Sequence, residues 1–238
     1  MIDFQVISLA EHKDIRVATA YERELGHGMG AVMILPSEIL EVQREYPIVF
    51  RKHPETGQFL PTALLGFEQQ ENLFLGEEGK WLGNYIPLAM IKGPFFLGVD
   101  KAGESEESLV LCINRNDARV GQDNGDLLFD ELGNPSAFLE AARLNLCRLH
   151  DGITDTRKMI DGFLAANLIE PVNMEIEFKN KTRVNFNGGY TINAEKLMQL
   201  NAEQLTALST EGYLALAYFI AGSLSNVRKL IDIKNKSF

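Results

Sequence analysis

Short apolar runs broken by glycine, proline and charged residues fill the chain from Glu45 to Val99. β-branched and aromatic residues dominate these runs, which is typical of strands. The connections between them are short, and short connections favour antiparallel neighbours because a parallel crossover needs about a dozen residues or more. The pattern therefore predicts an antiparallel meander. Its strands are expected at residues 47–50, 62–67, 72–75, from 81 onward, 95–99 and 108–113, the last two flanking an exposed acidic loop at 100–107.

A glycine-rich segment, Gly26 to Gly30, precedes another strand expected at 31–35. Its glycines alternate with single residues, which matches neither the dinucleotide-binding fingerprint nor the phosphate-binding loop with its lysine. The sequence predicts a flexible turn here.

Helical periodicity dominates the second half of the chain. Asn134 and Pro135 are typical of a helix start, and the pattern continues to about Asn167, with Gly152 and Gly162 as positions for a kink or a break. The apolar seam repeats at alternating spacings of three and four residues. Its members are Leu139, Ala142, Leu146, Leu149, Ile153, Thr156, Ile160 and Phe163.

A last helix is predicted from about Thr210 to Asp232. Its seam is the natural partner for the first seam. The helix is also apolar almost all round, which is typical of a helix buried in a core or at a subunit interface. The seam consists of Tyr213, Ala217, Ile220, Leu224, Val227 and Ile231.

Between these helices, residues 174–178 and 183–186 alternate with period two and predict a hairpin. The fold class is thus α+β, mainly an antiparallel meander in the first half packed against long helices in the second half. No linker or repeat divides the chain, so residues 1–238 are expected to form a single domain.

The formal net charge of −10 argues against a nucleic-acid partner, because phosphate binding needs a dense basic patch. The longest apolar run, 213–222, is about half of the roughly 20 residues in a membrane-spanning helix, so no membrane span is expected. The first residues carry an acid where a secretory signal carries basic charge, which favours a cytoplasmic location. Cys112 and Cys147 are expected to be free thiols.

Recognised catalytic, cofactor and metal motifs are missing from the sequence. There is no His-x-His, His-x-x-x-His or Cys-x-x-Cys spacing, so no metal is expected. The polar loop at 114–126 has the oxygen-rich residues of a calcium site but lacks the EF-hand order. No cofactor is predicted.

Trp81 and Tyr85 are the best candidates for a contact surface, with Asn72, Glu45 and Tyr46 as neighbours. Aromatic rings beside polar groups are typical of sites for a small molecule, a glycan or a peptide. The alternative is that both rings pack on the sheet, since large aromatic side chains are mostly buried. Glu45 likewise has two interpretations: it binds a ligand amine, or it serves as a cap or ion-pair partner within the protein.

A set of short motifs resembles the SapC-like family over roughly residues 25–232, while the first 24 residues resemble it only loosely. The motifs are Glu45-Tyr-Pro-Ile-Val-Phe50, Leu64-Leu-Gly66, Glu71-Asn-Leu-Phe-Leu75, Gly79-Lys-Trp81, Tyr85-Ile-Pro87, Leu111-Cys-Ile113, Leu128-Phe-Asp130, Gly133 and Ser223-Leu-Ser-Asn-Val227.

This family is bacterial and takes its name from an S-layer-associated protein. Its members are often encoded beside outer-membrane TonB-dependent receptors, tryptophan-halogenase-like flavoproteins and cupin-like proteins. The resemblance implies an accessory role in the uptake or modification of a nutrient, such as a glycan or a peptide, and it supplies no catalytic residue. A peptide-transporter permease shares the name, but a permease needs the membrane spans that this sequence lacks.

Three hypotheses from different classes follow. The first is a cytoplasmic, non-catalytic accessory protein that contacts a small ligand or a partner protein through the Trp81 region. The second is an enzyme whose site is assembled from scattered residues such as His150, Asp117, Asp123 and Glu45. The third is an assembly subunit that self-associates through the last helix into a homo-oligomer.

Overall fold

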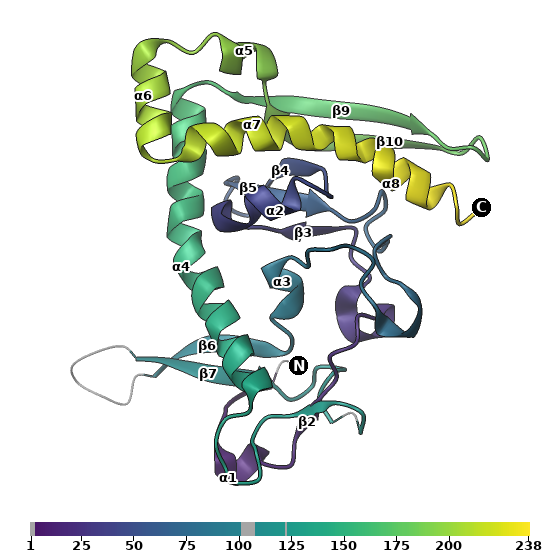
Figure 1. Ribbon diagram of the computed structural model, residues 1–238, viewed down its shortest axis with the longest axis vertical. Coiled ribbons are helices and arrows are strands. Elements are labelled where there is room, and N and C mark those ends of the chain that lie inside the picture. Colours follow the sequence, from purple (N-terminus) through teal and green to yellow (C-terminus); the bar gives the residue numbers. More distant parts are fainter. Residues whose placement is uncertain (1–2, 101–107, 122) are drawn as a thin grey trace. The chain divides into compact units, whose positions relative to one another are not determined.

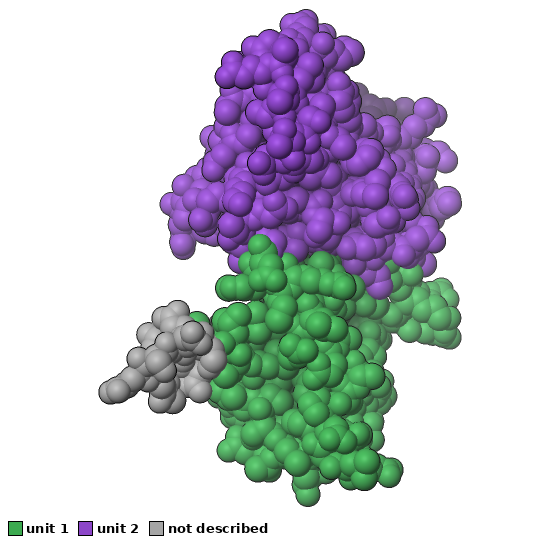
Figure 2. Space-filling model, turned by 60° about the vertical axis from the view of Figure 1, so that its left-hand side comes forward, with its two compact units in different colours: residues 1–28, 75–81, 88–151 green, residues 29–74, 82–87, 152–238 purple. Residues whose placement is uncertain are grey.

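A computed structural model describes residues 3–100, 108–121 and 123–238, so the acidic loop predicted at 100–107 lies almost wholly outside the described residues. The chain forms two compact units (Figure 2). Unit 1 comprises 1–28, 75–81 and 88–151, and unit 2 comprises 29–74, 82–87 and 152–238. The chain passes from one unit to the other five times, so neither unit is one continuous segment. The single domain over 1–238 stays a prediction.

Unit 1 is built on a three-stranded antiparallel sheet of order β1-β7-β6 (Figure 1). The register pairs Phe95 with Ile113 and Val99 with Leu109, which confirms the predicted pairing of 95–99 with 108–113. The strands are β1 (Phe4–Val6), β6 (Phe95–Asp100) and β7 (Ser108–Asn114), with a separate ladder of β2 (Arg16–Val17) and β8 (Asp126–Leu127) and the short helices α1 (Leu9–His12) and α3 (Leu88–Ile91).

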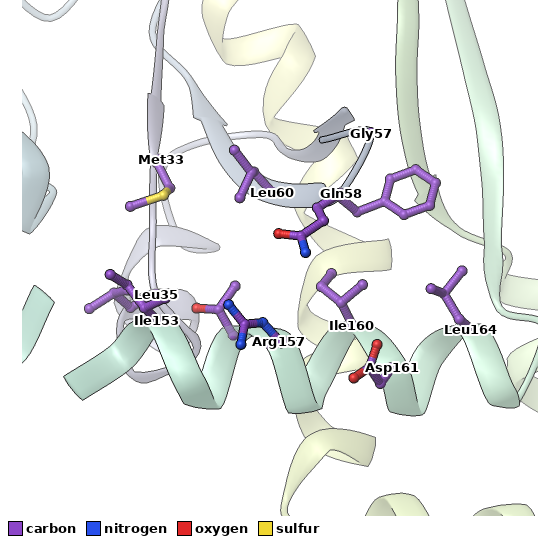
Figure 3. A pocket seen from close by; sticks show the side chains of 12 residues that line it. Met33, Leu35, Gly57, Gln58, Leu60, Ile153, Arg157, Ile160, Asp161 and Leu164 are labelled. Carbon is purple, nitrogen blue, oxygen red and sulfur yellow. The ribbon is translucent and has the colours of Figure 1, made fainter. Parts of the chain in front are cut away.

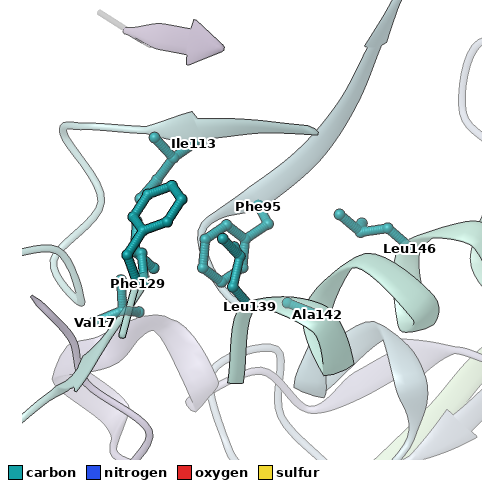
Figure 4. Close-up of a cluster of buried hydrophobic side chains, with 8 residues drawn as sticks. Val17, Phe95, Ile113, Phe129, Leu139, Ala142 and Leu146 are labelled. Carbon is teal, nitrogen blue, oxygen red and sulfur yellow. The ribbon is translucent and has the colours of Figure 1, made fainter. Parts of the chain in front are cut away.

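The core of unit 1 joins this sheet to the first half of helix α4 (Ala137–Ala165). Figure 4 shows Phe95 of the sheet beside Leu139 of the helix, and Ile113 and Ala142 belong to the same buried cluster. Leu146, one turn further on, is also buried. The first positions of the predicted seam therefore cover one face of the sheet, as their spacing requires.

Unit 2 is built on a five-stranded antiparallel sheet of order β3-β5-β4-β10-β9. The predicted hairpin forms β9 and β10, and Tyr190 of β10 pairs with Phe50 of β4. Two strands of the second half thus extend a sheet that begins in the first half. The strands are β3 (Ala31–Met33), β4 (Ile48–Lys52), β5 (Phe59–Leu64), β9 (Ile169–Glu177) and β10 (Arg183–Ile192).

Helix α4 is continuous over 29 residues, about 43 Å at 1.5 Å per residue, and neither Gly152 nor Gly162 interrupts it. It begins at Ala137 rather than at Asn134, because the hydroxyl of Ser136 caps it by accepting a hydrogen bond from the Leu139 N–H at 3.2 Å. The predicted α+β class, with a sheet-rich first half and long helices later, is confirmed.

The last predicted helix consists of α7 (Tyr213–Ser223), a 3-10 turn η4 (Leu224–Asn226) and α8 (Val227–Lys234). Helix α7 packs on β10, β4 and α2 (Ile39–Val42), and it meets α4 where the Tyr213 hydroxyl donates to Asp155 at 2.6 Å. This differs from the predicted pairing of the two helical seams. The Ser223 hydroxyl explains the difference, because it accepts from the Ile48 N–H at 2.9 Å and fixes α7 to β4.

The opposite side of α7 carries Tyr218, whose side chain is 49% exposed. The role of this helix in a homo-oligomer stays a prediction. Two further helices, α5 (Ala194–Met198) and α6 (Ala202–Thr210), precede α7. In the described parts of the chain, no helix combines the length and the apolarity of a membrane span.

The predicted strands at 72–75 and from 81 onward do not form. A single bridge joins Leu75 to Trp81, and a 3-10 turn at Glu77–Gly79 fills the space between them. The side chain of Asn72 accepts a hydrogen bond from the Phe74 N–H, and Glu78 has a positive φ of 56°. Both features are typical of turns, so this stretch is aromatic-rich but not extended.

Candidate functional site

A polar pocket of about 480 Å³ opens in unit 2 next to α2. We call it the Glu45 pocket. Two of the predicted contact residues, Glu45 and Tyr85, line it. The complete lining is Glu41, Arg44, Glu45, Asn84, Tyr85 and Lys229.

Glu45 supplies a buried carboxylate to the wall of this pocket, with 6% of the residue exposed. The backbone N–H of Asn84 donates to both carboxylate oxygens, at 2.8 and 3.0 Å, and the side-chain amide of Asn84 donates to Oε1. A carboxylate has about four lone-pair sites, so these bonds orient the group and leave acceptor capacity. Glu45 thus accepts hydrogen bonds from Asn84 at a pocket wall, and its binding of a ligand amine stays a prediction.

Tyr85 is held from two directions. Its carbonyl accepts from the Tyr46 hydroxyl at 2.5 Å, and its own hydroxyl donates to Glu38 at 3.0 Å. The other oxygen of Glu38 accepts from the Leu35 N–H at 2.9 Å, at the start of the helical segment. Tyr46 thus fixes the Tyr85 backbone and the buried acid Glu38 fixes the Tyr85 ring at the pocket.

Tyr46 and Asn72 lie behind this wall. Tyr46 is fully buried and packs on the Phe74 ring at 4.5 Å between centroids. Asn72 is 6% exposed and orients Phe74 through its hydrogen bond to the Phe74 N–H. Tyr46 supports the segment that carries Tyr85 through its bond to the Tyr85 carbonyl. Direct contact of Tyr46 and Asn72 with a ligand stays a prediction.

Trp81 belongs to unit 1, whereas Tyr85 belongs to unit 2, so a joint platform of the two rings stays a prediction. The Trp81 ring is half-buried and meets Tyr21 edge-on at 5.5 Å, and Tyr21 in turn packs on His27 at 5.1 Å. This aromatic cluster agrees with the alternative that Trp81 packs within the protein.

Charged residues also gather in unit 1 around Asp117, which accepts two side-chain hydrogen bonds from Arg119 at 2.7 Å. Burial alone would raise the pKa of Asp117, but its bonds to Arg119 and the charge of Lys92 hold that pKa below its ordinary value. Burial and the charge of Arg119 lower the pKa of Lys92. Burial likewise lowers the pKa of His27.

The remaining residues of the scattered-enzyme hypothesis have separate environments. His150 and Asp123 are exposed, and Glu45 belongs to the other unit. Across residues 3–100, 108–121 and 123–238, no three His, Cys, Asp or Glu side chains are placed to share a metal ion.

The Asp117–Arg119 pair gives a pH-dependent prediction. Asp117→Asn is expected to lower the free energy of unfolding by about 1.5–3 kcal/mol near neutral pH, because an amide cannot replace the charged hydrogen bonds. Since the folded-state pKa of Asp117 is depressed, the contribution is present above the ordinary pKa of 3.8 and is lost as the pH falls through the folded-state value. Denaturant unfolding between about pH 7 and pH 2 should show the unfolding free energies of the two proteins converging below about pH 3.8. A difference in unfolding free energy that stays constant over the whole pH range would contradict this account.

A family model for SapC matches residues 7–230 of the 238-residue chain. The chain belongs to the SapC family. The match to SapC begins at residue 7, so it includes most of the first 24 residues, which resemble the family only loosely in their motifs. No curated protein and no solved structure matches this SapC family member.

Sequence reasoning missed four residues of the Glu45 pocket of this SapC protein: Glu41, Arg44, Asn84 and Lys229. Arg44 and Asn84 are the immediate neighbours of Glu45 and Tyr85, so adjacency was an available signal for them. Lys229 lies on α8 and reaches the pocket only through the packing of the C-terminal helices on unit 2. Its cationic neighbours in sequence are typical of a solvated helix end.

Proposed function

We propose that this SapC family member is an accessory protein that binds a small polyhydroxylated ligand, such as a short glycan, in the Glu45 pocket. The observation that carries the proposal is the buried Glu45 carboxylate, which Asn84 orients at the wall of a polar pocket. A buried charge is costly to maintain. Hydrogen bonds that hold such a charge at the wall of a pocket therefore favour a role in ligand recognition.

The chemistry of the lining supports a hydroxyl-rich ligand. The Arg44 guanidinium donates to Glu41 at 2.8 Å and the Asn84 amide donates to Glu45, and Lys229 adds an ammonium group that can donate to a ligand. A sugar hydroxyl donates and accepts at once, so it matches such a mixed lining better than a purely anionic or cationic group. At about 30 Å³ per water-sized group, 480 Å³ holds roughly sixteen such groups, the size of one or two sugar rings.

The accessory role rests on the family resemblance. In that setting the protein acts in the cytoplasm with a nutrient-uptake or modification system that includes TonB-dependent receptors, halogenase-like flavoproteins and cupin-like proteins. Partner proteins from this set are part of the proposal. A short peptide with hydroxyl or amide side chains is the alternative ligand for the same lining, because its groups also donate and accept.

Titration calorimetry of the full chain with maltose and with N,N′-diacetylchitobiose tests the proposal. We expect at least one of them to bind, and Glu45→Gln and Lys229→Gln each to weaken it about tenfold, the effect of losing one hydrogen bond to a charged group. Lys229→Gln changes an exposed side chain, so it separates binding from folding. The matched control is Glu195→Gln, an exposed acid of unit 2 outside the pocket.

Two results would contradict the proposed function. One is the absence of heat for both sugars and for a serine- and asparagine-rich tripeptide at millimolar concentration. The other is binding that Glu45→Gln and Lys229→Gln leave at the strength of the Glu195→Gln control.

A further inference from the structure

A second cavity of unit 2 has an apolar wall and two charged side chains, Arg157 and Asp161, in its lining. It lies between helix α4 and the strands β3 and β5, with a volume of about 270 Å³, and we call it the α4 cleft (Figure 3). Leu35 and Leu60 come from the strand side, and Ile153, Ile160 and Leu164 come from α4. None of these residues lines the Glu45 pocket.

The exposure of the apolar lining departs from what the seam of α4 predicts. Ile153 is a seam residue but remains 50% exposed, and Leu164 is 48% exposed, although Ile160 between them is buried. All three residues line the cleft. The residues at 153, 157, 160 and 164 recur at helical spacing, so they form one stripe along the cleft side of α4. The apolar members of this stripe, at 153, 160 and 164, form a surface where an apolar group can be buried.

Arg157 and Asp161 lie within the same stretch of α4 and line the cleft one helical turn apart. Within the described residues, neither side chain makes a hydrogen bond or an ion pair. On a helix the order acid-then-base at a spacing of four is the better pairing, and here the order is reversed. Among the residues that the structure describes, a cation and an anion therefore lack partners beside an apolar wall.

The size of the cleft limits its occupant. A dry cavity of about 150 Å³ accommodates a benzene ring. The 270 Å³ of the α4 cleft thus accommodates one branched or aromatic side chain together with a few polar atoms. Longer chains would extend beyond the apolar wall.

We propose that the α4 cleft binds a free α-amino acid with a branched aliphatic or aromatic side chain. The ligand carboxylate pairs with the guanidinium of Arg157, which binds carboxylates in a bidentate manner. The ligand ammonium pairs with Asp161, and the side chain packs against Leu60 and Ile160. This site is separate from the Glu45 pocket, so it does not depend on the proposed function.

Calorimetric titration of the full chain with L-leucine and L-phenylalanine tests this inference. We expect at least one of the two to bind. The analogues 3-phenylpropionate, which lacks the ammonium, and 2-phenylethylamine, which lacks the carboxylate, should each bind at least tenfold more weakly than L-phenylalanine, if that is the ligand, because each leaves one charge of the cleft unpaired.

Two variants assign the contacts. Arg157→Gln and Asp161→Asn should each weaken amino-acid binding about tenfold. Both side chains are exposed, so both variants should fold. Arg148→Gln, an exposed arginine of α4 in unit 1, is the matched control and should bind like wild type.

The inference is overturned if neither amino acid binds at millimolar concentration. It is also overturned if Arg157→Gln and Asp161→Asn bind like the Arg148→Gln control, or if both analogues bind as tightly as the amino acid.

Discussion

Gly30→Ala is expected to lower the free energy of unfolding by about 3 kcal/mol or more, the upper range for forcing an atom into a packed position. A Cβ atom on Gly30 would lie 1.9 Å from the carbonyl oxygen of Glu68 and 3.3 Å from that of Glu71. These neighbours are backbone atoms and cannot rotate away.

Hydrogen bonds fix the backbone on both sides of this contact. The Gly30 N–H donates to the Gln69 carbonyl at 2.9 Å, and the Gly30 carbonyl accepts from Leu65 and Gly66. The new methyl group could be accommodated only by breaking some of these bonds, which is why the expected loss is large. The segment from Gly26 to Gly30 is therefore more than the flexible turn that its composition predicts.

Chemical denaturation of Gly30→Ala beside Gly222→Ala measures this effect. Gly222 lies in α7, and a Cβ there would meet nothing within 4 Å, so Gly222→Ala should raise stability by about 0.5–1 kcal/mol. Equal unfolding midpoints for wild type and Gly30→Ala would show that the close approach is not as described.

Phe163→Ala is expected to cost about 3–5 kcal/mol, the usual range for removing a buried ring. Phe163 is the last member of the α4 seam and is completely buried. Its ring meets Phe50 of β4 edge-on at 6.2 Å, so the truncation opens a cavity between helix and sheet.

The adjacent residue provides the matched control. Leu164 is half exposed, and Leu164→Ala should cost only about 1 kcal/mol, since less apolar surface leaves a buried environment. Urea unfolding of both variants compares the two sides of one helix. Similar losses for Phe163→Ala and Leu164→Ala would mean that the buried side of α4 is assigned incorrectly.

The elements with strong periodicity could be predicted from the sequence alone. The seam of α4 follows from its apolar spacing, and the β6–β7 and β9–β10 pairings follow from short connections between alternating or apolar runs. Local signals also explain the errors. The stretch from Asn72 to Trp81 has strand-like residues, but the Asn72 side chain and the left-handed Glu78 turn the backbone instead.

Contacts between residues far apart in the sequence could not be predicted. The helix that carries the second seam, which begins at Tyr213, could pack either on the α4 seam or on the sheet. The hydrogen bond that the Ser223 hydroxyl accepts from the Ile48 N–H of β4 fixes it to the sheet. In the Glu45 pocket, Glu45 and Tyr85 could be singled out by residue type and by their local motifs, whereas Lys229 joins them only through tertiary packing. Residue type alone also does not reveal that Tyr46 is fully buried.

The central claim is that a small ligand binds at the oriented carboxylate of Glu45. The most direct measurement is an amide NMR titration of the isotope-labelled protein with N,N′-diacetylchitobiose and maltose. Because the backbone and side-chain amides of Asn84 donate to Glu45, their resonances should shift in a saturable manner with at least one of the sugars, together with that of Tyr85. Resonances of Asn84 and Tyr85 that stay unchanged with both sugars at saturating concentration would contradict the account.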